Sequence, residues 1–175
     1  MVPDVVVVLA KSPVSGRVKT RLQPTFSGAE AAALAAAAVR DTLHAVASLG
    51  PRRTVLAWDG PPTPWMPPDL CVVPQRGSPL DERLENVFAD VYALERGREV
   101  TVLLVGMDTP QLVPRDLDVV WEGDAVLGPS CDGGYWAIGF RRHVPGAIGG
   151  VPMSTARTGA VQLARLEALG LTIPI

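Results

Sequence analysis

Two long runs of apolar residues stand out in the pattern of hydrophobic and polar positions along the chain. Residues 4–9 and 99–106 are rich in valine and leucine and alternate little with polar residues. Continuous β-branched runs of this length are typical of central parallel strands, which are buried on both faces. Shorter runs predict further strands at residues 53–58, 71–75, 124–129 and 135–140, and a last partial strand at 171–175.

The segments between these runs carry helix signals. Ser27 and Glu30 form a capping-box pattern ahead of an alanine-rich stretch, and Gly50 would end the helix that follows. Ser78, as the cap, and Pro79, as the first helical residue, begin a second predicted helix. Its apolar face consists of Leu80, Leu84, Val87, Val91 and Leu94. Further helices are expected near residues 114–121 and over residues 154–169.

Strands that alternate with helices predict an α/β fold, a three-layer sandwich around a mostly parallel sheet. The length fits one domain over residues 1–175. In such sheets, ligands bind beyond the carboxyl ends of the strands. The loops that follow residues 9, 58, 75 and 105 are therefore where we expect the chemistry.

Composition and charge narrow the class of protein. The chain is 47% hydrophobic and 19% charged, with a net charge of −2, so it has no general attraction to nucleic acid or to an anionic membrane. The first apolar run is too short to span a membrane, and Asp4 precedes it where a signal peptide carries positive charge. We expect a cytoplasmic protein. Cys71 and Cys131 show no CxxC spacing, which favours reduced thiols.

Cations cluster in the loop after the first strand. The two lysines of the chain, Lys11 and Lys19, lie there beside Gly16, Arg17 and Arg21. In an extended segment, side chains at alternate positions project to one side, and three cations on one side suit a polyphosphate. The alternative is a set of solvated loop cations. The loop contains neither GxxxxGK[ST] nor GxGxxG, so it is not a standard phosphate loop.

Two acids follow strands. Asp108 lies just beyond the second apolar run, where a carboxylate could hold Mg²⁺ or Mn²⁺ together with substrate phosphates, or could simply cap a turn. Asp132 precedes Gly133 and Gly134 between two predicted strands. This stretch predicts either a hairpin turn or a catalytic or metal-binding acid.

Two further stretches border the predicted ligand edge. In a strand, Tyr135 and Trp136 point to opposite sides, so at most one of them is expected to line a site. Gln75 ends a strand and Gly77 turns the chain toward a helix whose first amides are free for an anion or a base edge. Asp81 and Glu82 could be no more than partners of the helix dipole.

Four motifs together resemble a known family. "AKSPVSGRVKTRL", "PQRGSPLDERL", "GMDTPQL" and "GPSCDGGYWAIG", in this order, resemble an uncharacterised bacterial branch of the GT-A (nucleotide-diphospho-sugar transferase) superfamily. Members are commonly labelled glycosyltransferases; 2-phospho-lactate guanylyltransferase and the molybdenum cofactor nucleotidyltransferases are more distant relatives. The resemblance covers nearly the whole chain and implies a GT-A fold with a Rossmann-like nucleotide-binding half. It implies a metal-dependent transferase that uses a nucleotide sugar, or alternatively a nucleotidyltransferase that joins an NTP to a small phosphorylated acceptor.

The resemblance also implies roles for residues. Asp108 would bind the metal, and Asp132 would be a second ligand or the general base. Arg17 and Lys19, with Arg21, would stabilise charge on the phosphates during the reaction. The remaining expected contacts are the phosphate loop of Lys11, Gly16, Arg17, Lys19 and Arg21, the base contacts Gln75 and Gly77, and Gly133 and Gly134 on the acceptor or donor-sugar side.

Two departures from the family pattern bear on activity. Residues 152–155 read Pro-Met-Ser-Thr where relatives have Pro-Trp-Ser-Thr, a change that keeps the expected cap of the last helix. The sequence ends at Ile175, whereas relatives continue into an acidic DxDT segment, so we expect a C-terminally shortened fold. Three readings stay open: Asp132 supplies the second carboxylate, metal binding is weak, or the protein is a non-catalytic nucleotide-binding or regulatory member. A purely structural domain ranks last. An exposed edge at a shortened last strand would favour a homodimer.

Overall fold

The structure is a computed structural model that describes residues 1–22, 25–109, 111–119 and 121–174. Its strands are β1 (Val5–Lys11), β2 (Arg53–Asp59), β3 (Cys71–Pro74), β4 (Val102–Gly106), β5 (Ala125–Pro129) and β6 (Tyr135–Phe140). Its helices are α1 (Gly28–Leu49), α2 (Leu80–Leu94) and α3 (Thr158–Ala168), with the 3₁₀ helices η1 (Thr20–Leu22) and η2 (Pro114–Leu117).

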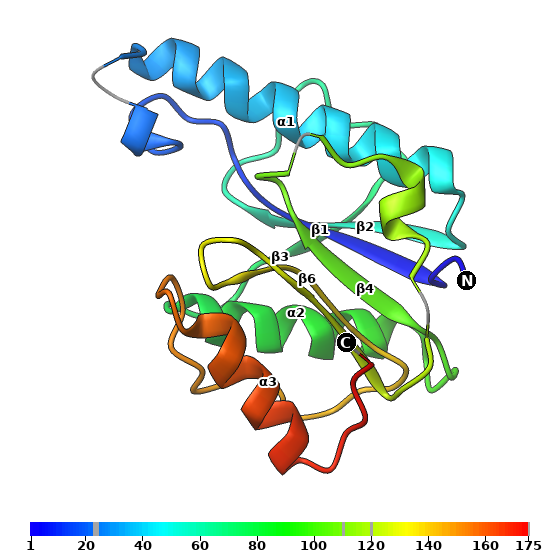
Figure 1. Cartoon of the computed structure of the whole chain (residues 1–175). Coiled ribbons are helices and arrows are strands. Elements are labelled where there is room, and N and C mark those ends of the chain that lie inside the picture. Colours follow the sequence, from blue (N-terminus) through cyan, green and yellow to red (C-terminus); the bar gives the residue numbers. More distant parts are fainter. Residues whose placement is uncertain (23–24, 110, 120, 175) are drawn as a thin grey trace.

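The six strands form one sheet in the order β3-β2-β1-β4-β6-β5 (Figure 1). β1 pairs in parallel with β2 and β4, and β2 pairs in parallel with β3. β6 runs antiparallel to both β4 and β5. The predicted mostly parallel sheet is therefore confirmed. Because β6 runs against its neighbours, the turn between β5 and β6 lies at the same edge as the carboxyl ends of β1 and β4.

Helices cover both faces of the sheet: α1 on one face, α2 and α3 on the other (Figure 1). Val6 and Val8 of β1 pack in the cluster on the α1 side, and Val5 and Val7 in the cluster on the α2 side. All four are fully buried, as expected for a strand without polar alternation. The three-layer sandwich is thus confirmed. Within the described residues, no helix is long and apolar enough to cross a membrane.

Local signals predicted the start of α1 correctly but not the start of α2. Ser27 accepts a hydrogen bond from the amide of Glu30, whose carboxylate accepts one from the amide of Ser27. In α2 the cap position is Pro79, which has no side chain able to cap. The amide of Ser78 instead donates to Oε2 of Glu82 at 3.2 Å. The prediction of Ser78 as the cap was wrong.

The C-terminal part departs most from the sequence prediction. α3 begins at Thr158, not at Ser154, because Ser154 has the left-handed φ of 59°, which is incompatible with a helix. Residues 171–174 form no strand, although the carbonyl of Thr172 accepts hydrogen bonds from the amides of Asp124 and Ala125. Ile175 lies outside the described residues. The helix expected near residues 114–121 is η2, and Val120 is also outside them.

Candidate functional site

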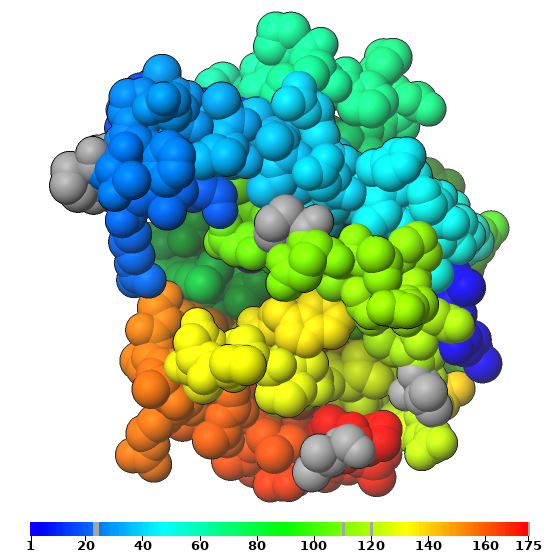
Figure 2. Space-filling model, turned by 45° about the horizontal axis from the view of Figure 1, so that its top comes forward, coloured from blue at the N-terminus to red at the C-terminus, as the bar shows by residue number. Residues whose placement is uncertain are grey.

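A cavity of about 640 Å³ opens at the edge of the sheet where β1 and β4 end and where the β5–β6 hairpin turns. Figure 2 shows the hollow between the N-terminal segment in blue, the hairpin in yellow and the segment before α3 in orange. We call its two sides the strand-end wall and the hairpin wall. The strand-end wall consists of Leu9, Met107, Asp108 and Thr109. The hairpin wall consists of Ser130, Asp132, Tyr135, Met153, Ser154 and Thr155.

The cation loop after β1 is folded, not extended. Residues 15–17 form a turn in which Gly16 has a φ of 76°, and η1 follows from residue 20. The prediction of an extended segment was therefore wrong, and the cations do not all project to one side. Arg21 lines the cavity. Lys11 approaches Asp59 to 3.7 Å instead, and Arg17 is exposed.

Lys19 joins the cation loop to the strand-end wall. Its Nζ lies 2.8 Å from Oδ1 of Asp108, which is 89 residues away in sequence. The carboxylate remains 78% exposed, whereas the Lys19 side chain is 24% exposed. The structure thus brings together the first loop and the acid after β4. A cation that bound Asp108 would compete with Lys19 for the same carboxylate.

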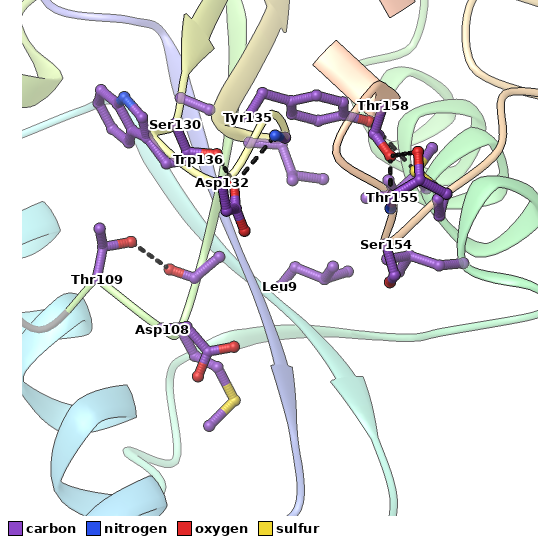
Figure 3. Close-up of a pocket in the computed structure, with 18 of the residues that line it drawn as sticks. Leu9, Asp108, Thr109, Ser130, Asp132, Tyr135, Trp136, Ser154, Thr155 and Thr158 are labelled. Carbon is purple, nitrogen blue, oxygen red and sulfur yellow. Dashed lines mark hydrogen bonds between the residues drawn. The ribbon is translucent and has the colours of Figure 1, made fainter. Parts of the chain in front are cut away.

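Asp132 lies in the turn between β5 and β6, so the hairpin interpretation of this stretch is confirmed. Its Oδ1 accepts hydrogen bonds from the Ser130 hydroxyl and, at 3.0 Å, from the amide of Gly134 (Figure 3). Both bonds stabilise the ionised carboxylate and so lower the pKa of Asp132. The bond from Ser130 has the larger effect on the pKa, and the bond from the Gly134 amide has the smaller one. The carboxylate of Asp132 is therefore ionised at neutral pH.

The two glycines of this turn have different surroundings. Gly134 lines the cavity, whereas Gly133 packs against the start of α3. The carbonyl of Gly133 accepts a hydrogen bond from the amide of Gly159 at 2.8 Å. Gly133 has a φ of 84°, and a Cβ there would collide with the carbonyl oxygen of Ala156. Gly133 therefore joins the hairpin to α3, and its positive φ and its close approach to Ala156 require a glycine.

Gln75 and Gly77 do not line the cavity. The side-chain amide of Gln75 donates to the carbonyls of Ala10 and Ala57, at 2.8 and 2.9 Å, and so joins the ends of β1 and β2. Its Oε1 accepts from Arg83 at 3.3 Å. Contact of Gln75 and Gly77 with a nucleotide base stays a prediction, and in this arrangement the Gln75 amide is already hydrogen-bonded.

Tyr135 and Trp136 pack on opposite faces of the sheet, as predicted. Both nevertheless line the cavity, so the expectation that at most one would do so was wrong. They are the first residues of β6, where the cavity extends around the end of the sheet. Burial, and to a smaller extent the charge of Asp81, raises the pKa of Tyr135, which therefore stays neutral.

The turn before α3 was missed as part of the site. Figure 3 shows Ser154, Thr155 and Thr158 beside the cavity, on the side away from Asp108 and Thr109. The Thr158 hydroxyl donates to the carbonyl of Pro152 at 2.9 Å and accepts from the amide of Thr155 at 3.0 Å. The sequence signal is the Pro-Met-Ser-Thr stretch, whose predicted role as the cap of the last helix is wrong because the cap position of α3 is Arg157.

The carboxylates fit a divalent ion only in part. Within the described ranges, no group of three or more His, Cys, Asp or Glu side chains could hold a metal ion. Asp108 and Asp132 line the same cavity from its two walls (Figure 3). Mg²⁺ in nucleotide sites is commonly held by one or two carboxylates plus substrate phosphates. The residues therefore fit an ion that the substrate helps to bind, and not a closed protein site.

The fold is that of the GT-A, or nucleotide-diphospho-sugar transferase, superfamily. The crystal structure of a "putative nucleotide-diphospho-sugar transferase" from Desulfovibrio desulfuricans G20 is similar, with a TM-score of 0.84 and 26% identity over 99% of this chain and 79% of that chain. The crystal structure of 4-diphosphocytidyl-2C-methyl-D-erythritol synthase shares the fold, with a TM-score of 0.57 and 12% identity over 99% of this chain and 87% of that one.

The family itself follows from the sequence match. The chain belongs to the family described as "Uncharacterized protein conserved in bacteria (DUF2064)", which matches residues 30–155. No curated protein is significantly similar to the chain in sequence. The matched range includes Asp108 and Asp132 but begins after the cation loop.

Proposed function

We propose that the protein transfers a sugar from a nucleotide-sugar donor to a hydroxyl group of a small acceptor. The observation that carries this proposal is the cavity itself, which has Arg21, Asp108 and Asp132 in its lining, with Lys19 paired to Asp108. Cations and carboxylates at one cavity are what a metal-chelated diphosphate requires. The 26% identical structure with a nucleotide-sugar name supports the choice of donor.

The cations would bind the diphosphate of the donor. Arg21 lines the cavity, Lys19 is within reach of Asp108, and the exposed Arg17 is free to turn toward a ligand. Donors placed on phosphate oxygens stabilise the charge that gathers there as the diphosphate leaves, by a few kcal/mol for each well-placed group. Asp108 and Asp132 would hold Mg²⁺ or Mn²⁺, which neutralises the diphosphate when it is bound.

In sugar transfer, the acceptor oxygen bonds to the anomeric carbon while the bond from that carbon to the diphosphate oxygen breaks. The diphosphate keeps the electron pair, and the acceptor hydroxyl loses its proton to a base. Asp132 is a candidate for that base, but its lowered pKa makes it a weak one. The variant Asp132→Asn separates the roles: lost metal binding indicates a ligand, and lost turnover with metal binding intact indicates a base.

Calorimetric titration tests the proposal. The four NTPs, UDP-sugars and GDP-sugars are titrated with and without Mn²⁺ into the intact chain, Asp108→Ala and the control Asp41→Ala on the exposed side of α1. We expect Mn²⁺-dependent binding of a nucleotide sugar that Asp108→Ala loses and Asp41→Ala keeps. Preference for an NTP would favour nucleotidyl transfer instead. Binding without turnover would favour a regulatory protein, and no binding would refute a nucleotide-dependent function.

A further inference from the structure

The ion pair between Lys19 and Asp108 joins the cation loop to the acid that would hold the metal. Nζ of Lys19 lies 2.8 Å from Oδ1 of Asp108. The Asp108 side chain lines the cavity and is 78% exposed, whereas that of Lys19 is only 24% exposed. Within the described residues, Lys19 is the one hydrogen-bond or ion-pair partner of this carboxylate. The partner that the protein gives to Asp108 is therefore a cation.

A metal ion and the Lys19 ammonium would compete for Asp108. Two cations held by one carboxylate repel each other, and a divalent ion repels the ammonium twice as strongly as a monovalent ion at the same distance. The alternative is that Lys19 orients the carboxylate through Oδ1 and leaves Oδ2 to the metal. Removal of the Lys19 charge separates these arrangements: competition predicts tighter metal binding, and orientation predicts unchanged or weaker binding.

The ion pair is weakly held. A salt bridge to an exposed carboxylate contributes little to stability, because water screens the attraction. Lys19 also has a φ of 45°, a left-handed backbone conformation that costs a non-glycine residue a comparable free energy. Little free energy is therefore needed to move Lys19 away from Asp108.

A diphosphate would give Lys19 a stronger partner. Arg21 lines the cavity two residues further on, and the amide of Leu22 donates to the carbonyl of Lys19 at 2.9 Å, so both cations belong to one turn. A diphosphate bound beside Asp108 and Arg21 would lie within reach of the Lys19 ammonium, which already contacts Asp108. It carries more negative charge than one carboxylate and offers several acceptor oxygens.

We infer that Lys19 is an internal competitor of the metal ion. It lowers the metal affinity of Asp108 until a diphosphate binds Lys19 instead. This inference rests on the proposed function, since it requires a metal-chelated diphosphate in this cavity. Metal and nucleotide then bind cooperatively, each raising the affinity for the other by the same factor. The protein takes up the metal together with its nucleotide, and the metal alone binds weakly.

Electron paramagnetic resonance of free Mn²⁺, in protein without nucleotide, tests the competition. Lys19→Met should lower the Kd of Mn²⁺ by about tenfold, because the competing charge is gone. Lys19→Arg keeps the charge and should bind Mn²⁺ as the intact chain does. Arg21→Met removes a charge that lines the same cavity without an ion pair to Asp108, so it should lower the Kd by less than about threefold. Asp108→Ala should lose binding, which identifies the site.

Calorimetric titration of UDP and GDP at saturating Mn²⁺ tests the transfer of Lys19 to the diphosphate. Lys19→Met should raise the Kd of the preferred nucleotide by about tenfold, so one substitution tightens metal binding and weakens nucleotide binding. The inference is overturned if Lys19→Met leaves the Kd of Mn²⁺ unchanged or higher, if Arg21→Met lowers it equally, or if the Kd of the nucleotide is unchanged. Absence of nucleotide binding in the intact chain would contradict the proposed function and the inference with it, whereas loss of the Mn²⁺ difference contradicts the inference alone.

Discussion

The two walls of the cavity are built in different ways. The strand-end wall presents Asp108, held by one ion pair to Lys19, beside a loop whose Arg17 is exposed. The hairpin wall is supported by a network of hydrogen bonds: Gly133 behind it is bonded to α3, Asp132 to its own turn, and Thr158 to Pro152. The charged group of the first wall has one ion pair and stays largely exposed, whereas most polar groups around the second wall are hydrogen-bonded within the protein.

Under the proposed function, the two walls contribute to ligand binding in different ways. A wall whose geometry is set by internal hydrogen bonds is preorganised, and it selects ligands by shape and charge. The strand-end wall is less fixed, and the cations of the loop beside it carry the charge that a diphosphate would bind. Substitutions in the hairpin wall should therefore affect stability first, and substitutions in the strand-end wall should affect binding first.

The largest effect is expected from Gly133→Ala. The new Cβ would collide with the carbonyl of Ala156 and would force alanine into a left-handed conformation. We expect the free energy of unfolding, measured by urea denaturation, to fall by about 3 kcal/mol. The control Gly170→Ala, with a φ of 73° and nothing within 4 Å, should lose only about 1 kcal/mol. Equal losses in both variants would remove the reason for calling this wall tightly built.

The next largest effect is expected from Glu85→Gln. This carboxylate holds three amides of the loop that leads to the hairpin wall. An uncharged amide side chain replaces these bonds poorly, so the free energy of unfolding should fall by about 2 kcal/mol. Glu82→Gln, in the same helix, weakens only the one 3.2 Å bond that the Ser78 amide donates, and should cost less than about 1 kcal/mol. A larger loss in Glu82→Gln would contradict the network described for Glu85.

Lys19→Met tests the opposite wall. Its ion pair joins a carboxylate that is 78% exposed, so the free energy of unfolding should change by less than about 0.5 kcal/mol. Loss of the charge should weaken nucleotide-diphosphate binding by about tenfold in calorimetry. Arg40→Met, on the exposed side of α1, is the matched control for lost positive charge and should bind as the intact chain does. Unchanged affinity in Lys19→Met would mean that this cation does not reach the phosphates.

Ser130→Ala should have the smallest effect on the protein, and it acts through the ionisation of Asp132. The Ser130 hydroxyl is the main cause of the lowered pKa of Asp132, so the pKa should rise in the variant. The ionised carboxylate of Asp132 stabilises the folded protein at neutral pH. This contribution is lost as the pH falls through the pKa that Asp132 has in the folded protein. In the variant the contribution should be lost at a higher pH. A ¹³C carboxyl NMR titration measures the shift, and Ser154→Ala, which removes no hydrogen bond of Asp132, should leave it unchanged.

Much of the fold and of the strand-end wall could be predicted from the sequence alone. The unbroken valine run predicts a central strand, and Ser27 with Glu30 predicts the start of α1, because these signals act between neighbouring residues. The position of Asp108 near the cation loop also follows, since the carboxyl ends of parallel strands meet at one edge. Lys19 and Asp108 are 89 residues apart and yet form an ion pair there.

The sequence predicted the Asp132 turn, but the place of the hairpin wall at the cavity depends on the tertiary structure. β6 runs antiparallel to β4, and this direction brings the Asp132 turn to the edge where β1 and β4 end. Ser154 forms part of the cavity because its left-handed backbone delays the start of α3. The bond between Gly133 and Gly159 then joins the two segments. Contacts between segments so far apart depend on how the elements pack, which no local pattern of residues encodes.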